Sequence, residues 1–453
     1  MPSIKKMINS VIKLAGLDVH TFSTVILRSW GIIAGAITLV MLPLWLSPAI
    51  QGYYYTFGSL LSLQIFFELG LSQVIIQLVA HEAAHLQFHD DGTISGPSDN
   101  IKRLRDIIAL LKRWYRIAAV LFVVLGGVAG VIFFERNSQV LQTMEWAPIW
   151  SAVVVLTAIN LYFSPKLAIL EGTGQVSVVA RLRLWQSLAG YTLLWGMLIA
   201  GAQLWSTVSI PFVSALVTFL WIKSRAPWLK ISKMHASLIS WRRDIFPLQW
   251  RIAVSWACGY FIFSLFTPIV FITHGATEAG RVGMAMSIFS AVTTLGLSWV
   301  NAKAPVFVMH LSRNEYVPLN RLFRGVLLRS TVITALLSYT IVGLALLGSY
   351  TGLSLVHRII TPSALFWIAC ASTVNTAVYA AATYMRAHRE EPMLPVSIAS
   401  AFATVIVLAL LRSDIVWMMF GYAAVSFFIT MPWTCKLMMQ YFARHSKISD
   451  CTT

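Results

Sequence analysis

Residues 50–79 read IQGYYYTFGSLLSLQIFFELGLSQVIIQLV, and this stretch decides the fold. Its only charged side chain is Glu68, and the rest is mostly apolar or aromatic. A helix of about 20 apolar residues is long enough to cross the hydrocarbon core of a bilayer. The stretch therefore predicts a transmembrane helix.

The same pattern recurs along the whole chain. Hydrophobic residues make up 58% of the 453 residues and charged residues 11%, whereas soluble domains carry about 25% charged residues. A single core stops growing at about 250–300 residues, so most of this apolar surface must face lipid. Eleven further spans are predicted near 22–46, 116–134, 147–169, 176–200, 203–222, 248–272, 279–305, 325–348, 361–384, 393–411 and 414–438.

The net charge of +17 reflects membrane topology. If the N-terminus is cytoplasmic, the outward loops contain only Arg136, Arg281, Arg358 and Arg412, and the other 30 of the 34 Lys and Arg lie on the inner side. Such an excess is typical of cytoplasmic loops. We therefore expect both termini in the cytoplasm and no nucleic-acid partner.

The polar segments divide the chain into two halves. We predict an all-α, polytopic membrane protein with a six-helix bundle over 1–222, a basic cytoplasmic linker over 223–247, and a second bundle over 248–453. A polar cytoplasmic loop at about 81–115 interrupts the first bundle. Because Ile101, Leu104, Ile108 and Leu111 recur at helical spacing opposite basic residues, we expect an amphipathic helix on the membrane surface there.

The two halves resemble each other in the same orientation. Gly-Leu-Ser occurs at residues 70–72 and again at 296–298, and Gly52 has a counterpart in Gly280. An even number of helices in each half predicts parallel repeats about an axis along the membrane normal. Arg28, near the start of the first span, corresponds in the same way to Arg251 in the seventh.

Glu68 is the only acidic residue well inside a predicted span. Gln64, Glu68 and Ser72 are spaced by four residues, so on a continuous helix they lie on one face. Such polar groups either hydrogen-bond between helices and order the bundle, or bind a coupling ion. The functional alternative makes Glu68 and Gln64 a site for H⁺ or Na⁺, with no other cofactor expected.

Basic residues gather at the predicted inner ends of the spans. Each of them can snorkel to lipid headgroups, but together they can also make the mouth of a cavity basic and attract phosphate. We take Arg28, Arg251, Arg181, Arg183 and Lys303 as candidate substrate-binding residues; Lys166 and Arg329 lie at similar positions.

The run His81-Glu82-Ala83-Ala84-His85 has the spacing of a zinc-protease motif. A catalytic zinc also needs a third ligand and an open coordination position. His89, which follows in the same loop, does not supply the distant third ligand of such families. We therefore predict neither a catalytic metal nor protease activity, and we interpret the run as the polar end of a helix.

The stretch at 51–60, with its glycine–tyrosine start, and the closing Gly-Leu at 70–71 resemble polysaccharide flippases of the Wzx type. These proteins belong to the multidrug/oligosaccharidyl-lipid/polysaccharide exporter superfamily. The resemblance implies two bundles around a central basic cavity in a bacterial inner membrane. It also implies that undecaprenyl-diphosphate-linked oligosaccharide crosses from the inner to the outer leaflet by alternating access, for surface polysaccharides such as O-antigen.

The resemblance carries further expectations. Arg28 matches in position the first-helix arginine that such flippases present to pyrophosphate. A flippase makes no covalent change, so no enzyme activity is expected. A polysaccharide polymerase and a chain-length regulator are possible partners.

Other membrane proteins share parts of this pattern. A multidrug or cation antiporter of the same superfamily would have the same fold, with an acidic cavity for its cationic substrates. A polysaccharide polymerase would resemble a chain with a large outer loop, and a major-facilitator transporter one with a Gly-rich, Arg-rich motif after the second span; we find neither. Asp90-Asp91 lacks the spaced acidic motif of metal-dependent glycosyltransferases.

Overall fold

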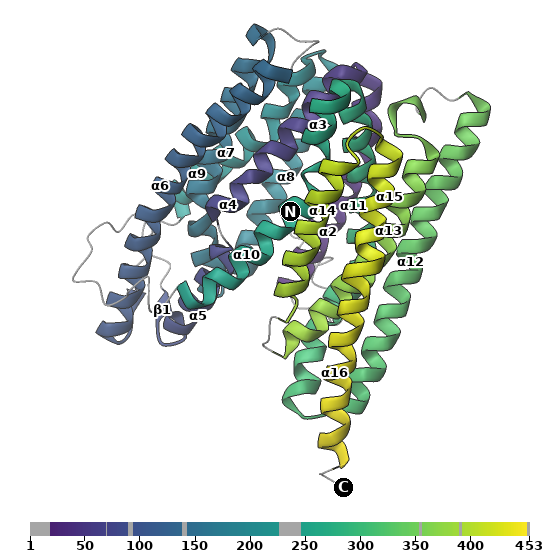
Figure 1. Cartoon of the computed structure of the whole chain (residues 1–453). Helices are drawn as coiled ribbons and strands as arrows, with labels where there is room; N and C mark the ends of the chain where they lie inside the picture. Colours follow the sequence, from purple (N-terminus) through teal and green to yellow (C-terminus); the bar gives the residue numbers. More distant parts are fainter. Residues whose placement is uncertain are drawn as a thin grey trace, which may run out of the picture. The chain divides into compact units, whose positions relative to one another are not determined.

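The computed structural model shows a helical protein that divides into two compact units (Figure 1). The first unit comprises Met1–Leu46 and Leu63–Ala253, and the second comprises Ser47–Ser62 and Val254–Thr453. The described residues are 19–68, 70–88, 94–137, 143–225, 246–352, 356–388 and 392–450. Most of the predicted linker, residues 226–245, lies outside them.

The described part of the first unit consists mainly of helices. They are α2 (Val19–Trp45), α4 (Ile65–Glu68), α5 (Leu71–Ala83), α6 (Ser98–Asn137), α7 (Thr143–Gly172), α8 (Val176–Ile199), α9 (Ser209–Arg225) and the start of α10 (Phe246–Phe263). Two short strands, β1 (Gln87–Phe88) and β2 (Ile94–Ser95), form an antiparallel hairpin between α5 and α6. Within this unit α7 packs against α5, α6 and α9, and α8 packs against α2 and α9.

The second unit begins with a helix from the N-terminal half of the sequence. Its helices are α3 (Pro48–Leu61), the rest of α10, α11 (Phe266–Ser312), α12 (Tyr316–Thr351), α13 (Pro362–Ala387), α14 (Leu394–Leu410), α15 (Ile415–Val425) and α16 (Met431–Asp450). A π-helical turn, Ser426–Thr430, joins α15 to α16. The helix α3 packs along α11, and α13 packs against α11, α12 and α15.

The predicted fold class is confirmed. In the described part of the chain, eight helical segments are long and apolar enough to cross a membrane, and α10 with α11 forms one such segment of 64 residues. Within α11, Gly275 has non-helical dihedral angles and separates the seventh predicted span from the eighth. The protein is an all-α, polytopic membrane protein of about twelve transmembrane helices.

The second predicted span is not one continuous helix. It contains α3, a 3-10 turn at Ser62–Gln64, the single turn α4, and α5. The break before α5 falls at Gly70, whose φ of +65° is unfavourable for residues with a side chain. Their spacing predicts that Gln64, Glu68 and Ser72 share one helical face. This prediction is wrong, because the helix is interrupted between them.

The predicted amphipathic helix does not lie on the membrane surface. It is the first part of α6, a single helix of 40 residues and about 60 Å. Leu104, Ile108 and Leu111 are 0%, 4% and 1% exposed, so its apolar face is buried inside the first unit. The spacing of the apolar residues correctly predicts a helix with one apolar face. That face is covered by protein and not by lipid.

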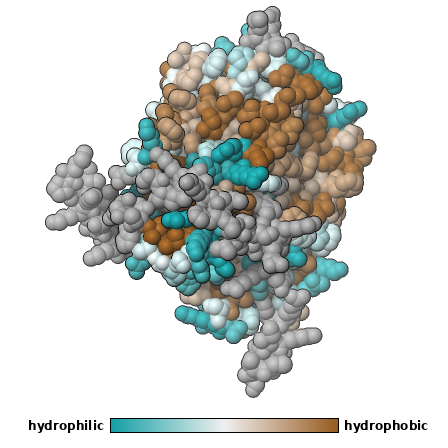
Figure 2. Space-filling model, turned by 90° about the vertical axis from the view of Figure 1, so that its left-hand side faces the viewer, coloured by the Kyte–Doolittle hydropathy of each residue, from teal (hydrophilic) through white to brown (hydrophobic). Residues whose placement is uncertain are grey.

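The outer face of α6 shows where lipid begins. Exposed apolar residues start at Ile117 and continue to Ile132. Large apolar side chains at such positions are stable when lipid surrounds them. Figure 2 shows a broad hydrophobic patch on the face it draws, with hydrophilic residues grouped beside it.

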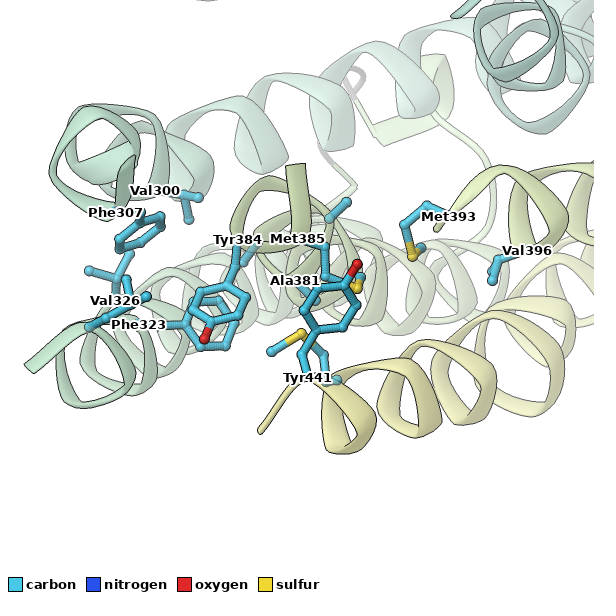
Figure 3. Packing of buried hydrophobic residues seen from close by; sticks show 14 residues of the cluster. Val300, Phe307, Phe323, Val326, Ala381, Tyr384, Met385, Met393, Val396 and Tyr441 are labelled. Carbon is cyan, nitrogen blue, oxygen red and sulfur yellow. The ribbon is translucent and has the colours of Figure 1, made fainter. Parts of the chain in front are cut away.

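One core cluster joins five helices of the second unit (Figure 3). Phe307 of α11, Phe323 of α12 and Tyr384 of α13 pack ring against ring, with Phe323 and Tyr384 centroids 4.5 Å apart. The Tyr384 hydroxyl donates a hydrogen bond to Asn320 at 2.6 Å. Aromatic packing and a satisfied polar group therefore fix this end of the bundle.

The predicted topology is tested by cysteine labelling. Cysteines placed singly at Ser95, Ser237 and Asn314, in a variant without native cysteines, should react with a membrane-impermeant maleimide only after the membrane is opened, because all three positions are predicted to be cytoplasmic. A cysteine at Arg412 is the outward control and should react in intact spheroplasts. Labelling of any of the three inner positions in intact spheroplasts would contradict the topology.

Candidate functional site

Glu68 ends the single turn α4 in the first unit and is half-buried. Its Oε1 accepts hydrogen bonds from the Ser72 hydroxyl, on α5, and from the Ser164 hydroxyl, on α7, the latter at 3.2 Å. The two serine oxygens are themselves 3.2 Å apart. Three oxygen atoms from three helices therefore meet at one point.

The break in the second span positions this acid. Gly70 follows Glu68 closely, and a Cβ there would overlap the side chain of Ile252, on α10. On the other side, the Phe67 ring packs on Phe122 of α6 with centroids 5.4 Å apart. Two neighbours of Glu68 in the chain are therefore fixed in place. Gly70 has no room for a side chain, and Phe67 is held by an aromatic contact.

Tyr115 of α6 is a further polar group of this cluster. Its side chain is 0% exposed, and it lies close enough to interact with Glu68 and Ser72. Its hydroxyl makes no hydrogen bond of ordinary geometry in the described part of the chain. This buried hydroxyl therefore adds a fourth polar group to the cluster, from a fourth helix.

Gln64 is not part of the cluster. It lies in the 3-10 turn before α4, and among the described residues no hydrogen bond joins it to Glu68 or Ser72. The i, i+4 spacing correctly predicts that Glu68 and Ser72 lie close together, because their side chains form a hydrogen bond. Ser164 and Tyr115 were missed, since no local pattern links them to Glu68.

The two arginines paired by the repeat both belong to the first unit. Arg28, on α2, and Arg251, on α10, are exposed. The Arg251 guanidinium lies 5.5 Å from the ring centroid of the neighbouring Trp250. Neither arginine forms an ion pair with an acid among the described residues.

The remaining candidates differ in their partners. Arg183, on α8, forms an ion pair of 2.9 Å with Glu171 of α7, which ties the two helices together. Arg181 is exposed, and its Nε donates to the Ser177 carbonyl of the same helix at 3.3 Å. Lys303, on α11 in the second unit, is exposed. Arg183 is therefore less available to an anion than the others.

The acid of the run His81–His85 connects two helices. Helix α5 ends at Ala83, so His85 does not continue the helical face of His81. Glu82 is buried, accepts from Asn100 Nδ2 at 2.9 Å, and lies 3.7 Å from Arg103 Nη1, which joins α5 to the start of α6. No group of three metal-ligating side chains occurs in the described ranges, and His89, Asp90 and Asp91 lie outside them.

Two lysines lie at the same level of two packed helices, a pairing that the sequence did not predict. Lys166 of α7 has its Nζ 4.4 Å from the Tyr162 ring centroid and 4.7 Å from that of Phe163. Lys112 of α6 lies level with it, because the contacts of Phe134 with Trp146 and of Trp150 with Gly127 set an antiparallel register of the two helices. Hydropathy placed Lys166 at a span end, but the pairing depends on how α6 and α7 pack.

Neither a protein-family model nor a curated protein sequence matches this chain. Solved structures do match. An inward-facing multidrug resistance MATE family transporter of the MOP superfamily aligns with a TM-score of 0.65 and 12% identity, covering 94% of this chain and 96% of that one. The lipid II flippase MurJ, inward closed, aligns at 0.58 and 13% identity, covering 93% and 87%.

A third similar structure is the MATE multidrug transporter DinF-BH, with a TM-score of 0.58, 13% identity, and coverage of 92% and 94%. These alignments extend over nearly the whole length of each chain, whereas the identities are too low to carry substrate or mechanism. The chain has the fold shared by MATE multidrug transporters and the lipid II flippase MurJ.

Proposed function

We propose that this protein is a flippase that moves an undecaprenyl-diphosphate-linked oligosaccharide from the inner to the outer leaflet of a bacterial inner membrane. The observation that carries the proposal is that candidate basic residues in each of the two units lack acidic partners in the described part of the chain. Arg28, Arg251, Arg181 and Lys303 have no ion-pair partner among the described residues. Unpaired cations near membrane depth favour an anionic substrate.

The chemistry of these groups fits a diphosphate. A guanidinium stays charged at every physiological pH and binds phosphate oxygens through two parallel hydrogen bonds. The solved structures with this fold include a flippase of lipid II as well as multidrug transporters. No covalent step is needed, so the proposed activity requires no catalytic residue. A polysaccharide polymerase and a chain-length regulator are the proposed partners of the export reaction.

The Glu68 cluster is the proposed coupling site for H⁺ or Na⁺. The Ser72 hydroxyl donates to Glu68, and the Ser164 hydroxyl lies 3.2 Å from both Glu68 Oε1 and the Ser72 oxygen, so it can donate to either. Oxygen atoms that converge in this way can coordinate a cation such as Na⁺. A proton bound to Glu68 would add positive charge at the same place, so the cluster is the proposed place for either ion.

The second candidate function is a multidrug or cation antiporter. Glu68 at membrane depth and the similarity to MATE transporters favour it. The two functions predict opposite charge preferences in the substrate. A cationic dye that binds the purified protein, with no effect of a lipid diphosphate, would support the antiporter.

The diphosphate role is tested with Arg28→Lys and Arg251→Lys. Lysine keeps the charge but loses the two-pronged hydrogen bond, and a charge-assisted hydrogen bond contributes about 1.5–3 kcal/mol. We expect each variant to export glycan about tenfold more slowly or worse, with normal abundance in the membrane. The measurement is surface glycan, together with lipid-linked repeat units inside cells that have this protein as their only exporter.

The matched control is Arg105→Lys, which makes the same change at an exposed position of α6 outside the lipid-facing span. It should export normally. If Arg28→Lys and Arg251→Lys also export normally, the two arginines only set topology, and the proposed binding role is wrong.

A further inference from the structure

Lys112 and Lys166 form a pair of like charges within the first unit. They project from α6 and α7, two helices that pack along each other. Both side chains are half-buried. The contacts of Phe134 with Trp146 and of Trp150 with Gly127 set an antiparallel register of α6 and α7 that brings Lys112 and Lys166 to the same level. In the described part of the chain neither lysine has an acidic partner.

Two other partly buried acids of the described chain have a cationic partner. Glu171 has Arg183 at 2.9 Å, and Glu278 has Arg281 at 2.6 Å. Two neighbouring cations that share no acid are unfavourable, because burial weakens their hydration and increases their mutual repulsion. A site that keeps such a pair gains stability when an anion binds between the two charges.

The surroundings of Lys166 hold its ammonium in place. The rings of Tyr162 and Phe163 lie close to Nζ, at 4.4 and 4.7 Å from their centroids. A cation over an aromatic face is attracted by the negative charge density of the ring. This contact orients the ammonium but does not neutralise it, so its charge stays available to a ligand.

The position of the pair along the helices indicates its level in the membrane. Lys112 precedes Ile117, the first residue of the exposed apolar face of α6, by little more than one helical turn. Lys166 lies less than two turns before Gly172, the end of α7. Under the predicted topology both lysines lie where the cytoplasmic leaflet exposes its phosphate groups.

We infer that Lys112 and Lys166 form a binding site for a lipid-borne phosphate group, namely the diphosphate of the carrier lipid as it enters from the cytoplasmic leaflet. The inference rests on the proposed flippase function and adds an entry site to the arginines considered above. Two ammonium groups match the charge of a diphosphate better than that of a phosphodiester. Lysine binds phosphate as a point charge, which suits a transient entry site.

The test uses the full-length protein in nanodiscs of phosphatidylcholine, with binding of undecaprenyl diphosphate measured by titration. Lys112→Gln and Lys166→Gln should each weaken binding by about tenfold, since each removes a charge-assisted hydrogen bond. Lys166→Arg keeps the charge and should bind nearly as tightly as the parent protein. Lys102→Gln is the matched control, because Lys102 is exposed on the same helix and lies 3.7 Å from Asp99.

A second titration with phosphatidylglycerol distinguishes the two sources of phosphate. The inference requires that undecaprenyl diphosphate binds more tightly and that phosphatidylglycerol does not displace it at equal concentration. Equal competition would assign the site to bulk lipid headgroups and overturn the inference. Unchanged binding in both Gln variants would also overturn it while the flippase function stands, whereas a parent protein that binds no diphosphate would refute both.

Discussion

Replacing Gly52 with alanine is expected to lower the thermal stability of the protein strongly. Gly52 lies where α3 crosses α11, and a Cβ at this position would overlap the Ala276 carbonyl oxygen and lie 2.5 Å from its carbonyl carbon. Backbone atoms cannot rotate away as a side chain can. Overpacking of this kind costs about 1–3 kcal/mol or more, so the unfolding temperature in detergent should fall by several degrees.

The same crossing explains why the change cannot be absorbed nearby. A Cβ on Gly280 would lie 2.8 Å from the Gly52 nitrogen, and one on Gly283 would lie 2.6 Å from Tyr55 Cγ. Gln51 Nε2 donates to the Gly280 carbonyl at 3.2 Å. Small residues let two membrane helices approach to backbone contact, and the gain is van der Waals packing and hydrogen bonding.

Gly58→Ala is the matched control for this prediction. It adds the same methyl group to the same helix, but apart from the neighbouring residues and the backbone of its own helix no atom lies within 4 Å of the new Cβ. Alanine is favoured over glycine inside a helix by about 0.5–1 kcal/mol, so this variant should be as stable as the parent protein or slightly more. If Gly52→Ala and Gly58→Ala unfold at the same temperature, the close contact between α3 and α11 does not exist.

Gly52 and Gly280 also show what the sequence could predict about the fold. Comparison of the two halves made these glycines equivalent, and the structure brings them into contact. Hydropathy found the transmembrane segments because each must be apolar over its whole length. Hydropathy did not predict the break at Gly70. A glycine within an apolar run can adopt a helical or a left-handed conformation, and the hydropathy is the same for both.

The candidate site was predictable only where it is local. Glu68 and Ser72 were linked by their spacing, and they do bond across the break. Ser164 contributes to the same cluster from 96 residues beyond Glu68. Lys112 and Lys166 lie at the same level only because α6 packs antiparallel on α7. Contacts of this kind depend on tertiary packing, which a single sequence does not encode as a pattern.

Glu68→Gln is expected to leave the protein folded while abolishing the dependence of transport on an ion gradient. Glutamine has nearly the same size as glutamate, and its amide oxygen can still accept from Ser72 and Ser164, so stability should change by no more than about 1 kcal/mol. It cannot ionise, and therefore it can neither release a proton nor attract Na⁺ into the cluster. The measurement is transport in proteoliposomes with an imposed proton or sodium gradient and, separately, with none.

The control is Glu135→Gln, the same substitution at an exposed position near the far end of α6. It should keep the gradient response of the parent protein, because no part of the Glu68 cluster depends on it. If Glu68→Gln responds to the gradient as the parent does, the cluster only orders the bundle and coupling occurs elsewhere. If the response to the gradient disappears while exchange without a gradient persists, substrate binding and transport do not need an ionisable acid. Glu68 is then the group whose occupation by a cation drives the conformational cycle.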